Sequence, residues 1–476
     1  MGLGLDDSFD PKVDPAVRVA ASRLRTRLAR YYATEGVGDR IVFGLPVGGY
    51  VPTIVERIER RPEVGPVVAI GAFGAPAASA EVAELAAGIS ESLATAVSRF
   101  QGAVTVGPVD PGPELGPVDA ARAVRLDHGA DLVLLGGLRV VEGTLRVTVR
   151  LLDAAAGTTI WADQFDGELD GTAMLATEDR IVEHLSSTLA DEHGLIPAAM
   201  ERVAASPDAV GHRALLGFYS YARSLDEGRQ PEVIASLEAA VERAPGHAPY
   251  LGALASVLAF AGVGTALIAP PSAELLERAE ALARRALAVD ASEPYARLVT
   301  AYLRVVGDEL DEGRRLAEGI LADGRYTPSI RSMCGICLCL SGAWDAGIAE
   351  LRIGHLLNPA LPAWQHGFLA LDDLANGDPT EALAHARQVD TPGLVWGPLL
   401  RAAAFGAQGE VTRGVAELEL IGGFPALEAE GAELMRGHMR LPEPVVTAAL
   451  AGLLPVAIAL QAPTIATTST DEGEGR

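Results

Sequence analysis

The spacing of apolar residues divides the 476-residue chain into stretches of different periodicity. Near the N-terminus, apolar side chains recur at intervals of three and four residues from Val17 to Tyr31, which predicts an amphipathic helix. Two short β-prone runs follow within residues 40–52, separated by Pro46 and a glycine pair, and this pattern predicts a small hairpin. We therefore expect residues 1–55 to form a helix followed by a wing-like hairpin.

Residues 66–193 alternate between strand and helix patterns. Strands are expected at 67–73 and 103–109, helices at 79–100 and 118–127, three successive strands at 131–141, 145–153 and 158–165, and a closing helix at 172–192. In the middle strand, Arg146, Thr148 and Arg150 alternate with apolar residues, which predicts a sheet with one face in water. The order βαβαβββα predicts an α/β sandwich with a mixed sheet.

The remainder of the chain carries a repeat of helical pairs. Glycines that suit turns recur at intervals of 34, 45, 35, 35 and 32 residues, namely Gly228, Gly262, Gly307, Gly342, Gly377 and Gly409. A second series, expected in the first helix of each pair, recurs at 35, 34 and 32 residues: Tyr295, Ile330, Trp364 and Trp396. In the expected second helices, small residues such as Gly347 and Gly354 would let the paired helices approach closely, and Pro359 would stop the second helix.

These intervals match the period of about 34 residues of tetratricopeptide repeats, with one insertion near residues 263–271. We expect six helical pairs in an all-α tetratricopeptide-like solenoid at 208–437, a capping helix at 438–462 and a disordered tail at 463–476.

Residues 66–192 resemble the TolB amino-terminal-type domain of bacterial signalling proteins, which commonly precedes tetratricopeptide repeats. The resemblance is carried by residues 87–93, by the strand-like run 131–137, and by Leu151, Leu152, Asp153, Gly157 and residues 160–162. Residues 70–76 depart from the family's usual loop. The resemblance implies a signalling domain.

Residues 10–52 resemble the recognition helix and wing of response-regulator-type winged helices, at the front of proteins labelled as adenylate cyclases or transcriptional activators. In such proteins further residues precede this segment, so we expect a truncated winged-helix-like segment here. Five arginines without an intervening acid are the DNA-contact candidates: Arg18, Arg23, Arg25, Arg27 and Arg30. The wing residues would be Gly48, Gly49 and Tyr50. The alternative is a solvated helix against an acidic protein.

Charge and hydropathy restrict the partners. The net charge is −25, so the chain as a whole repels phosphate backbones and anionic lipids, and any DNA binding should be weak and local. The N-terminus lacks the basic start and apolar core of a signal peptide. The apolar run at 444–460 is interrupted by Pro455 and is shorter than the about 20 residues of a membrane span, so it is expected to pack as a terminal helix. We expect a cytoplasmic protein.

Candidate chemistry is sparse. Cys334, Cys337 and Cys339 have a spacing that can chelate zinc, but no second pair accompanies them, so helix-core packing is the preferred interpretation. His184 and His193 lack the spacing of a zinc-protease motif. No nucleotide loop, serine-hydrolase elbow or pair of cyclase aspartates is found. We expect no catalytic residues, no metal and no cofactor.

Three functions compete at this point. The first is an interaction protein that binds an extended or helical peptide on the concave face of the solenoid. The second is a DNA-binding transcriptional regulator that uses the arginine-rich helix and wing. The third is the regulatory arm of a nucleotide cyclase system. The oligomeric state and the identity of the partner remain open.

Overall fold

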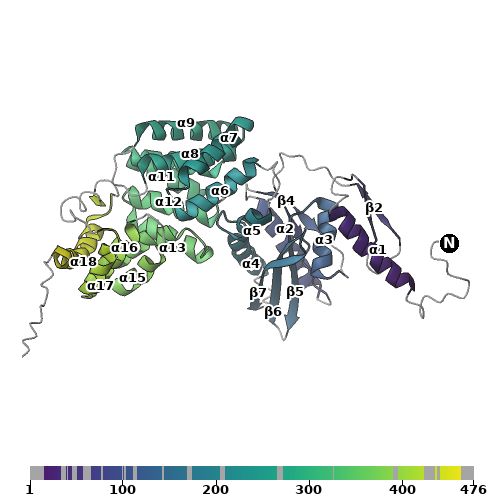
Figure 1. Cartoon of the computed structure of the whole chain (residues 1–476). Coiled ribbons are helices and arrows are strands. Elements are labelled where there is room, and N and C mark those ends of the chain that lie inside the picture. The colour runs from purple at the N-terminus through teal and green to yellow at the C-terminus, as the bar shows by residue number, and fades with distance from the viewer. Residues whose placement is uncertain are drawn as a thin grey trace, which may run out of the picture. The chain divides into compact units, whose positions relative to one another are not determined.

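A computed structural model describes residues 16–33, 39, 41–45, 51–56, 66–76, 79–98, 100, 103–110, 115–141, 144–168, 174–203, 210–264, 272–324, 326–389, 395–422, 435–436 and 440–461. The chain divides into two compact units. The first comprises Met1–Leu185 and Arg202–Ala209, and the second Ser186–Glu201 and Val210–Arg476. All described strands belong to the first unit, whereas the second is helical (Figure 1).

The first unit begins with helix α1 (Ala16–Ala33) and the antiparallel strands β1 (Ile41–Gly44) and β2 (Thr53–Glu56). Helix and hairpin were both predicted, but β2 follows Pro52, whereas the expected β-prone run ended there. Proline lacks the N–H that a ladder needs, which favours pairing beyond it. The Arg25 Nε donates a hydrogen bond to the Leu45 carbonyl (2.8 Å) and so ties the helix to the hairpin.

A five-stranded mixed sheet forms the centre of the first unit, in the order β4-β3-β5-β6-β7. Its strands are β3 (Val67–Gly71), β4 (Val104–Val109), β5 (Leu132–Val141), β6 (Thr144–Asp153) and β7 (Thr158–Glu168). Strand β3 pairs in parallel with β4 and β5, and the others pair antiparallel. Helices α2 (Ala80–Ser98), α3 (Pro117–His128) and α4 (Met174–Leu189) complete the predicted order βαβαβββα.

The two faces of the sheet are buried to different extents. Helix α3 packs Ala121 and Val124 against one face of β3 and β5, together with Ala69 and Val133. In β6 the apolar residues are buried, while Arg146 and Arg150 are exposed, as the alternating pattern predicted. Arg146 also forms an ion pair with Asp166 of β7 (2.7 Å) on this water-facing side.

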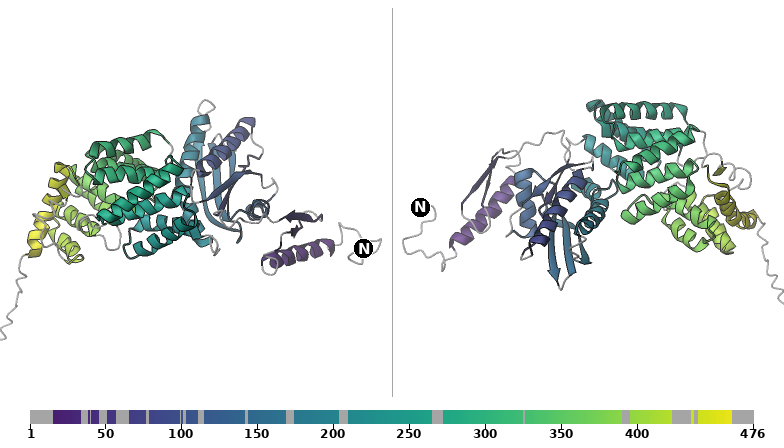
Figure 2. Two further views of the ribbon diagram at one scale, coloured as in Figure 1. Left: turned by 90° about the horizontal axis from the view of Figure 1, so that it is seen from above. Right: turned by 180° about the vertical axis from the view of Figure 1, so that it is seen from behind.

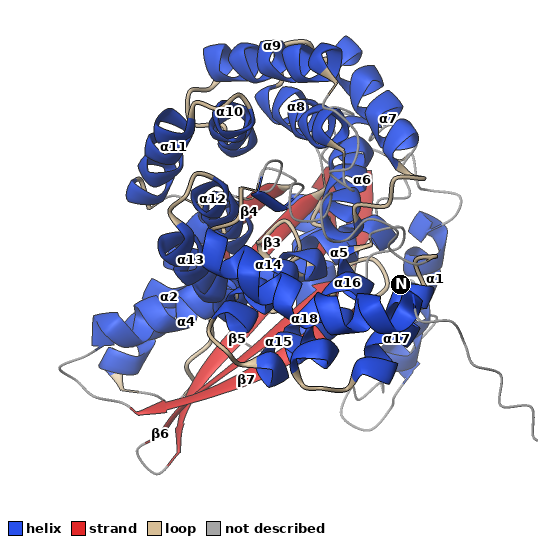
Figure 3. Ribbon diagram, turned by 90° about the vertical axis from the view of Figure 1, so that its left-hand side faces the viewer, coloured by secondary structure: helices blue, strands red, loops and turns tan. Residues whose placement is uncertain are grey.

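The second unit contains six described helical pairs. The first members are α6 (Val210–Ser224), α8 (Ala248–Val263), α10 (Pro294–Val306), α12 (Pro328–Leu340), α14 (His366–Ala375, preceded by the 3₁₀ turn η1, Ala363–Gln365) and α16 (Trp396–Ala407). The second members are α7 (Gln230–Arg243), α9 (Ala273–Val289), α11 (Leu310–Ala322), α13 (Trp344–Leu357), α15 (Pro379–Gln388) and α17 (Val411–Glu419). Seen along the array, α8, α10 and α12 lie inside α7, α9 and α11 (Figure 3).

The turns within the pairs follow a slightly different register from the one that the glycines predicted. Gly342, Gly377 and Gly409 have the expected left-handed backbone, with φ of 86°, 77° and 78°. Gly262 instead belongs to helix α8, and the left-handed position after α8 is Gly264. After α6 and α10 the left-handed residues are Leu225 and Asp308, so glycine spacing alone could not locate those turns.

Small residues bring paired helices together, as predicted. A β-carbon at Gly335 of α12 would lie 2.7 Å from the carbonyl oxygen of Gly347 in α13. A β-carbon at Gly354 would lie 3.1 Å from Cβ of Ser332. The helices of this pair can therefore approach only because these positions lack side chains.

Helix α18 (Glu443–Gln461) packs on α14, α16 and α17 at the end of the array (Figure 2). Its residues Val446, Leu453 and Val456 are buried in a core shared with α16. Among the described helices, α18 is long and apolar enough to cross a membrane, with a mean hydropathy of 1.9 over 19 residues. Length and composition alone give this result, and a packed core helix passes the same test.

The boundary between the units differs from the sequence-based expectation, which placed it between residues 193 and 208. Residues Ser186–Glu201, including most of α5 (Leu195–Val203), belong to the helical unit. Ile196, Ala199 and Met200 of α5 are fully buried. Within this segment, Asp191 and Glu192 form hydrogen bonds with Ser329 and Thr327, which lie far along the chain.

Candidate functional site

The inner face of the helical unit encloses a cavity of about 40 Å³. Each of the first five pairs contributes to its lining, which presents mostly apolar surface and includes Phe218, Phe260, Tyr295, Tyr302, Met333 and Trp364. These residues lie on α6, α8, α10, α12 and η1, the members that face inward (Figure 3). The cavity is therefore a product of the superhelix and of no single repeat.

One hydrogen bond closes the turn of the superhelix around this cavity. The indole Nε1 of Trp364 in η1 donates to the carbonyl oxygen of Ala222 in α6 (3.1 Å), 142 residues away. The first and fifth pairs are thus in direct contact. Trp364 was predicted as a repeat position, but the sequence did not indicate that it would close the array.

A buried acidic turn joins the end of α4 to this inner face. The Asp191 carboxylate accepts hydrogen bonds from the amide of Ser329 (2.8 Å), the hydroxyl of Ser329 (2.7 Å) and the amide of His193 (2.9 Å). Ser329 lies in the first turn of α12, so the carboxylate sits at the positive end of that helix. The Asp191 side chain is fully buried, and these hydrogen bonds fix the position of its carboxylate.

Two further carboxyl groups are buried nearby. Glu192 accepts a hydrogen bond from the hydroxyl of Thr327 (2.7 Å), the N-cap residue of α12. Glu293 caps α10 by accepting from the amide of Ala296 (2.5 Å), and its Oε1 has no hydrogen-bond partner in the described part of the chain. Acidic side chains thus cap both inner helices at this end of the array.

Burial changes the ionisation of these groups. It raises the pKa of Asp191, and burial together with the charge of Asp191 raises the pKa of Glu192 to about 8. Burial likewise raises the pKa of Glu293 to about 8. His193, which lines the cavity, has its pKa lowered to about 3, first by burial and then by the charge of Arg223. Burial therefore favours the neutral forms of His193, Glu192 and Glu293 at this site.

The three cysteines of the chain lie in α12. Cys334, Cys337 and Cys339 are buried in α12, and burial raises the pKa of the Cys337 thiol to about 12. Such thiols are protonated and serve as packing groups. No group of three or more histidine, cysteine or acidic side chains among the described residues is arranged to hold a metal ion.

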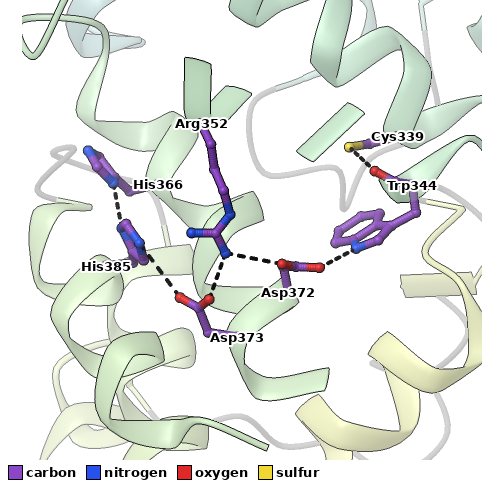
Figure 4. Close-up of polar contacts among 7 residues, drawn as sticks. All are labelled: Cys339, Trp344, Arg352, His366, Asp372, Asp373 and His385. Atoms are coloured by element: carbon purple, nitrogen blue, oxygen red, sulfur yellow. Dashed lines mark hydrogen bonds and ion pairs between the residues drawn. The ribbon is translucent and has the colours of Figure 1, made fainter. Parts of the chain in front are cut away.

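A second polar network links two successive pairs (Figure 4). The Nη2 of Arg352 donates to Asp372 (3.1 Å) and to Asp373 (2.8 Å), and the Trp344 indole donates to Asp372 (2.9 Å). His385 lies 3.6 Å from Asp373. The network connects α13, α14 and α15, and its contacts indicate a structural role in joining repeats.

Three histidines extend this network. The Nδ1 atoms of His366 and His385 are 2.8 Å apart, and the rings of His355 and His366 have centroids separated by 4.3 Å. Burial lowers the pKa of all three, to about 4 for His355 and to about 3 for His366. Sequence reasoning treated the histidines as scattered, because the 30 residues that separate His355 from His385 are brought together only by the stacking of repeats.

The predicted DNA-contact residues are only partly described. Arg23 and Arg27 are exposed on α1, whereas Arg25 is half-buried and holds the hairpin. The side chains of Arg18 and Arg30 lie outside the described side chains, as do the wing residues Gly48, Gly49 and Tyr50. Among the described candidates, Arg23 and Arg27 are therefore exposed to solvent, whereas Arg25 contacts the hairpin.

Comparisons with known proteins give little further resolution. No protein family matches the sequence, and no curated protein matches it. Among solved structures, the chain is similar to a tetratricopeptide repeat protein from Parabacteroides merdae ATCC 43184, with 16% identity and a TM-score of 0.31. The likeness covers 56% of this chain and 95% of that protein.

Proposed function

We propose that this chain is a non-enzymatic regulatory or interaction protein whose helical repeat unit binds a protein or peptide partner. The observation that supports this most is the array of six helical pairs, of which the first five contribute residues to one inner face. The α/β unit, through its resemblance to the TolB amino-terminal type, would serve as a signalling domain.

We propose that the concave face takes an extended or a helical peptide. An α-helix with side chains is about 10 Å across, so a helical partner would stay outside the cavity of about 40 Å³ that α6, α8, α10 and α12 line. The contact of Trp364 with Ala222 forms one side of that cavity. We place the partner along the rim of the inner face, where single side chains could enter.

A capture experiment with the full chain tests this function. Phe260→Glu alters the inner face, while Val289→Glu changes an exposed residue at the end of α9 and serves as the matched control. We expect a partner retained by the parent and by Val289→Glu to be lost with Phe260→Glu, at unchanged helix content by circular dichroism. A reproducible failure of the folded parent to retain any protein would contradict the proposal.

We further propose that the protein acts in the cytoplasm and that α18 serves as a cap. The buried face of α18 packs on α14, α16 and α17, which a membrane-spanning role would disrupt. Full-length protein should appear in the soluble fraction. Persistent membrane association after a high-salt wash would overturn this assignment.

DNA binding by the N-terminal segment is the second candidate. It is favoured by the succession of α1 and the antiparallel hairpin, with Arg23 and Arg27 exposed on the helix. Since the net charge is −25, we expect such binding to be weak and sensitive to salt. Sequence-specific nanomolar binding at physiological salt would instead make DNA recognition the leading function.

A further inference from the structure

The outer edge of strand β7 is open to a further strand. In the sheet order β4-β3-β5-β6-β7, β7 is a terminal strand of 11 residues that pairs with β6 (Figure 1). The strand at the other edge, β4, is six residues long and includes Pro108, which has no N–H to donate. Strand β7 contains no proline, so every second residue directs an N–H and a C=O away from β6. Such an edge is a template for the addition of a strand.

One side chain marks which backbone groups of β7 point outward. The N–H of Gln164 donates to Oδ1 of Asp163 (2.8 Å), so it is directed away from the ladder with β6. Because backbone groups alternate along an antiparallel ladder, those of Ala162, Gln164 and Asp166 share this edge. The Asp163 carboxylate therefore occupies the place where a carbonyl oxygen of an added strand would accept from Gln164.

The side chains beside this edge are partly apolar. Trp161, Asp163 and Phe165 lie on one face of β7, where the β6 residues opposite them are buried. Trp161 and Phe165 are half-buried, and the Phe165 ring meets that of His184 in α4 edge to face, with centroids 4.7 Å apart. Asp163, between the two aromatic residues, is exposed. An added strand would cover both aromatic side chains with apolar residues and would face Asp163 with the residue between them.

The charges of β7 indicate the kind of strand that fits. The strand carries three acidic residues, Asp163, Asp166 and Glu168, and no basic one. Asp166 is already paired with Arg146 of β6 (2.7 Å). Two β7 strands would bring acidic side chains together, and like charges on neighbouring strands destabilise their pairing. A basic segment of another protein is therefore the occupant that the charges favour over a second copy of the chain.

We propose that the outer edge of β7 binds an extended basic segment of another protein, which pairs with it as an additional strand. In the complex, a carbonyl oxygen of the segment accepts from the Gln164 N–H, and a lysine or arginine of the segment pairs with the Asp163 carboxylate. Apolar side chains on either side of that cation pack on Trp161 and Phe165. This surface lies in the first unit and does not depend on the inner face of the helical repeats.

A synthetic peptide with this alternation tests the edge in the full-length protein. The probe is acetyl-Lys-Thr-Val-Thr-Lys-Thr-Val-Thr-Lys-amide, labelled for fluorescence anisotropy at physiological salt. Two control peptides carry N-methyl groups, one on its threonines and the other on its valines and central lysine, so that each has one edge blocked. Both keep the charge of the probe, which controls for unspecific attraction by a chain of net charge −25. A third control has glutamate in place of every lysine.

Three variants of the protein accompany these peptides. Gln164→Pro removes the outward N–H at an edge strand, where proline is tolerated. Asp163→Asn removes the charge and keeps an acceptor oxygen. The matched control is Glu91→Gln, which neutralises an exposed acid on α2, a helix that packs on β3, β4 and β5.

We expect the parent and Glu91→Gln to bind the lysine peptide equally. Gln164→Pro should lose this binding, and Asp163→Asn should weaken it about two- to fivefold. One methylated peptide should bind like the probe, whereas the other methylated peptide and the glutamate peptide should not bind. Binding should also slow amide hydrogen exchange in residues 158–168.

Four results would contradict the proposal. A parent that does not bind the lysine peptide, equal behaviour of the two methylated peptides, or unchanged hydrogen exchange in β7 would overturn the pairing at this edge. Binding that is indifferent to Asp163→Asn would overturn the basic character of the partner. Light scattering adds a further test, because a parent that dimerises and a Gln164→Pro variant that does not would assign the edge to a second copy of the chain.

Discussion

At the scale of single residues, Asp191 is the side chain on which the inner face depends most. Its carboxylate satisfies three donors in a fully buried place. We expect Asp191→Ala to lower the free energy of unfolding by about 3 kcal/mol, because buried donors lose their acceptor. The control is Asp378→Ala, which removes an exposed N-cap of α15 and should cost about 1 kcal/mol. Equal losses in urea unfolding of the two variants would contradict the anchoring role.

The exposed arginines of α1 give a second prediction for single residues. If this helix contacts phosphates, replacing Arg23 and Arg27 with glutamine should lower the slope of log affinity against log salt by about two. The control replaces Arg284 and Arg285, which are exposed on α9, and should leave the slope unchanged. Fluorescence anisotropy with a short duplex at several salt concentrations measures both. An unchanged slope in the α1 variant would remove this helix from the DNA interface.

At the scale of elements, the attachment of α18 depends on close contact with α16. A β-carbon at Gly452 would collide with the backbone of Ala403. Gly452→Leu should therefore displace the helix, lower stability by about 3 kcal/mol or more and expose the apolar core beneath it. Ala451→Leu, at the neighbouring exposed position, is the matched control.

Thermal unfolding and light scattering distinguish these two variants. The Gly452 variant should melt earlier and associate, because Leu453 and Val456 would lose their cover. The Ala451 variant should melt like the parent and stay in the same oligomeric state. If both variants behave like the parent, α18 does not cap the array.

At the scale of the whole molecule, half-buried histidines and buried glutamic acids make the free energy of unfolding depend on pH in opposite directions. His355 and His366 have folded pKa values of about 4 and about 3, below the ordinary 6.5. Their contribution is fully present above pH 6.5 and is lost as the pH falls towards the folded values, because the unfolded chain binds more protons. We expect His366→Asn to flatten the acid side of a melting-temperature profile. An acid side as steep as that of the parent would contradict this assignment.

The alkaline side depends on the buried glutamic acids. Glu192 and Glu293 have pKa values of about 8 in the folded state, against an ordinary value of 4.5. Their contribution is fully present below pH 4.5 and is lost as the pH rises through 8, because the folded chain then gives up protons that it had retained. Glu293→Gln should reduce the fall in melting temperature between pH 6 and 9, whereas Glu274→Gln, exposed on α9, should not.

The local pattern of hydrophobic and polar residues was sufficient to predict the helices and strands of the chain. The order βαβαβββα, the wet face of β6 and the six helical pairs follow from periodicity, since each depends on neighbours within one or two elements. The close approach of the paired helices at Gly347 and Gly354 was likewise anticipated from small residues at fixed intervals, whereas Gly335 was not singled out. At two turns the residue with a left-handed backbone is Leu225 or Asp308 instead of a glycine, so the spacing of glycines did not locate these turns.

The candidate site, by contrast, was decided by tertiary structure alone. Asp191 meets Ser329 across 138 residues, and Trp364 meets Ala222 across 142. These distances depend on the curvature of the superhelix, which sums small rotations at every interface between repeats and leaves no periodic trace in the sequence. The sequence therefore determined which helices form and pair, whereas the path of the array determined that an acidic turn, a histidine and a ring of aromatic side chains enclose one cavity.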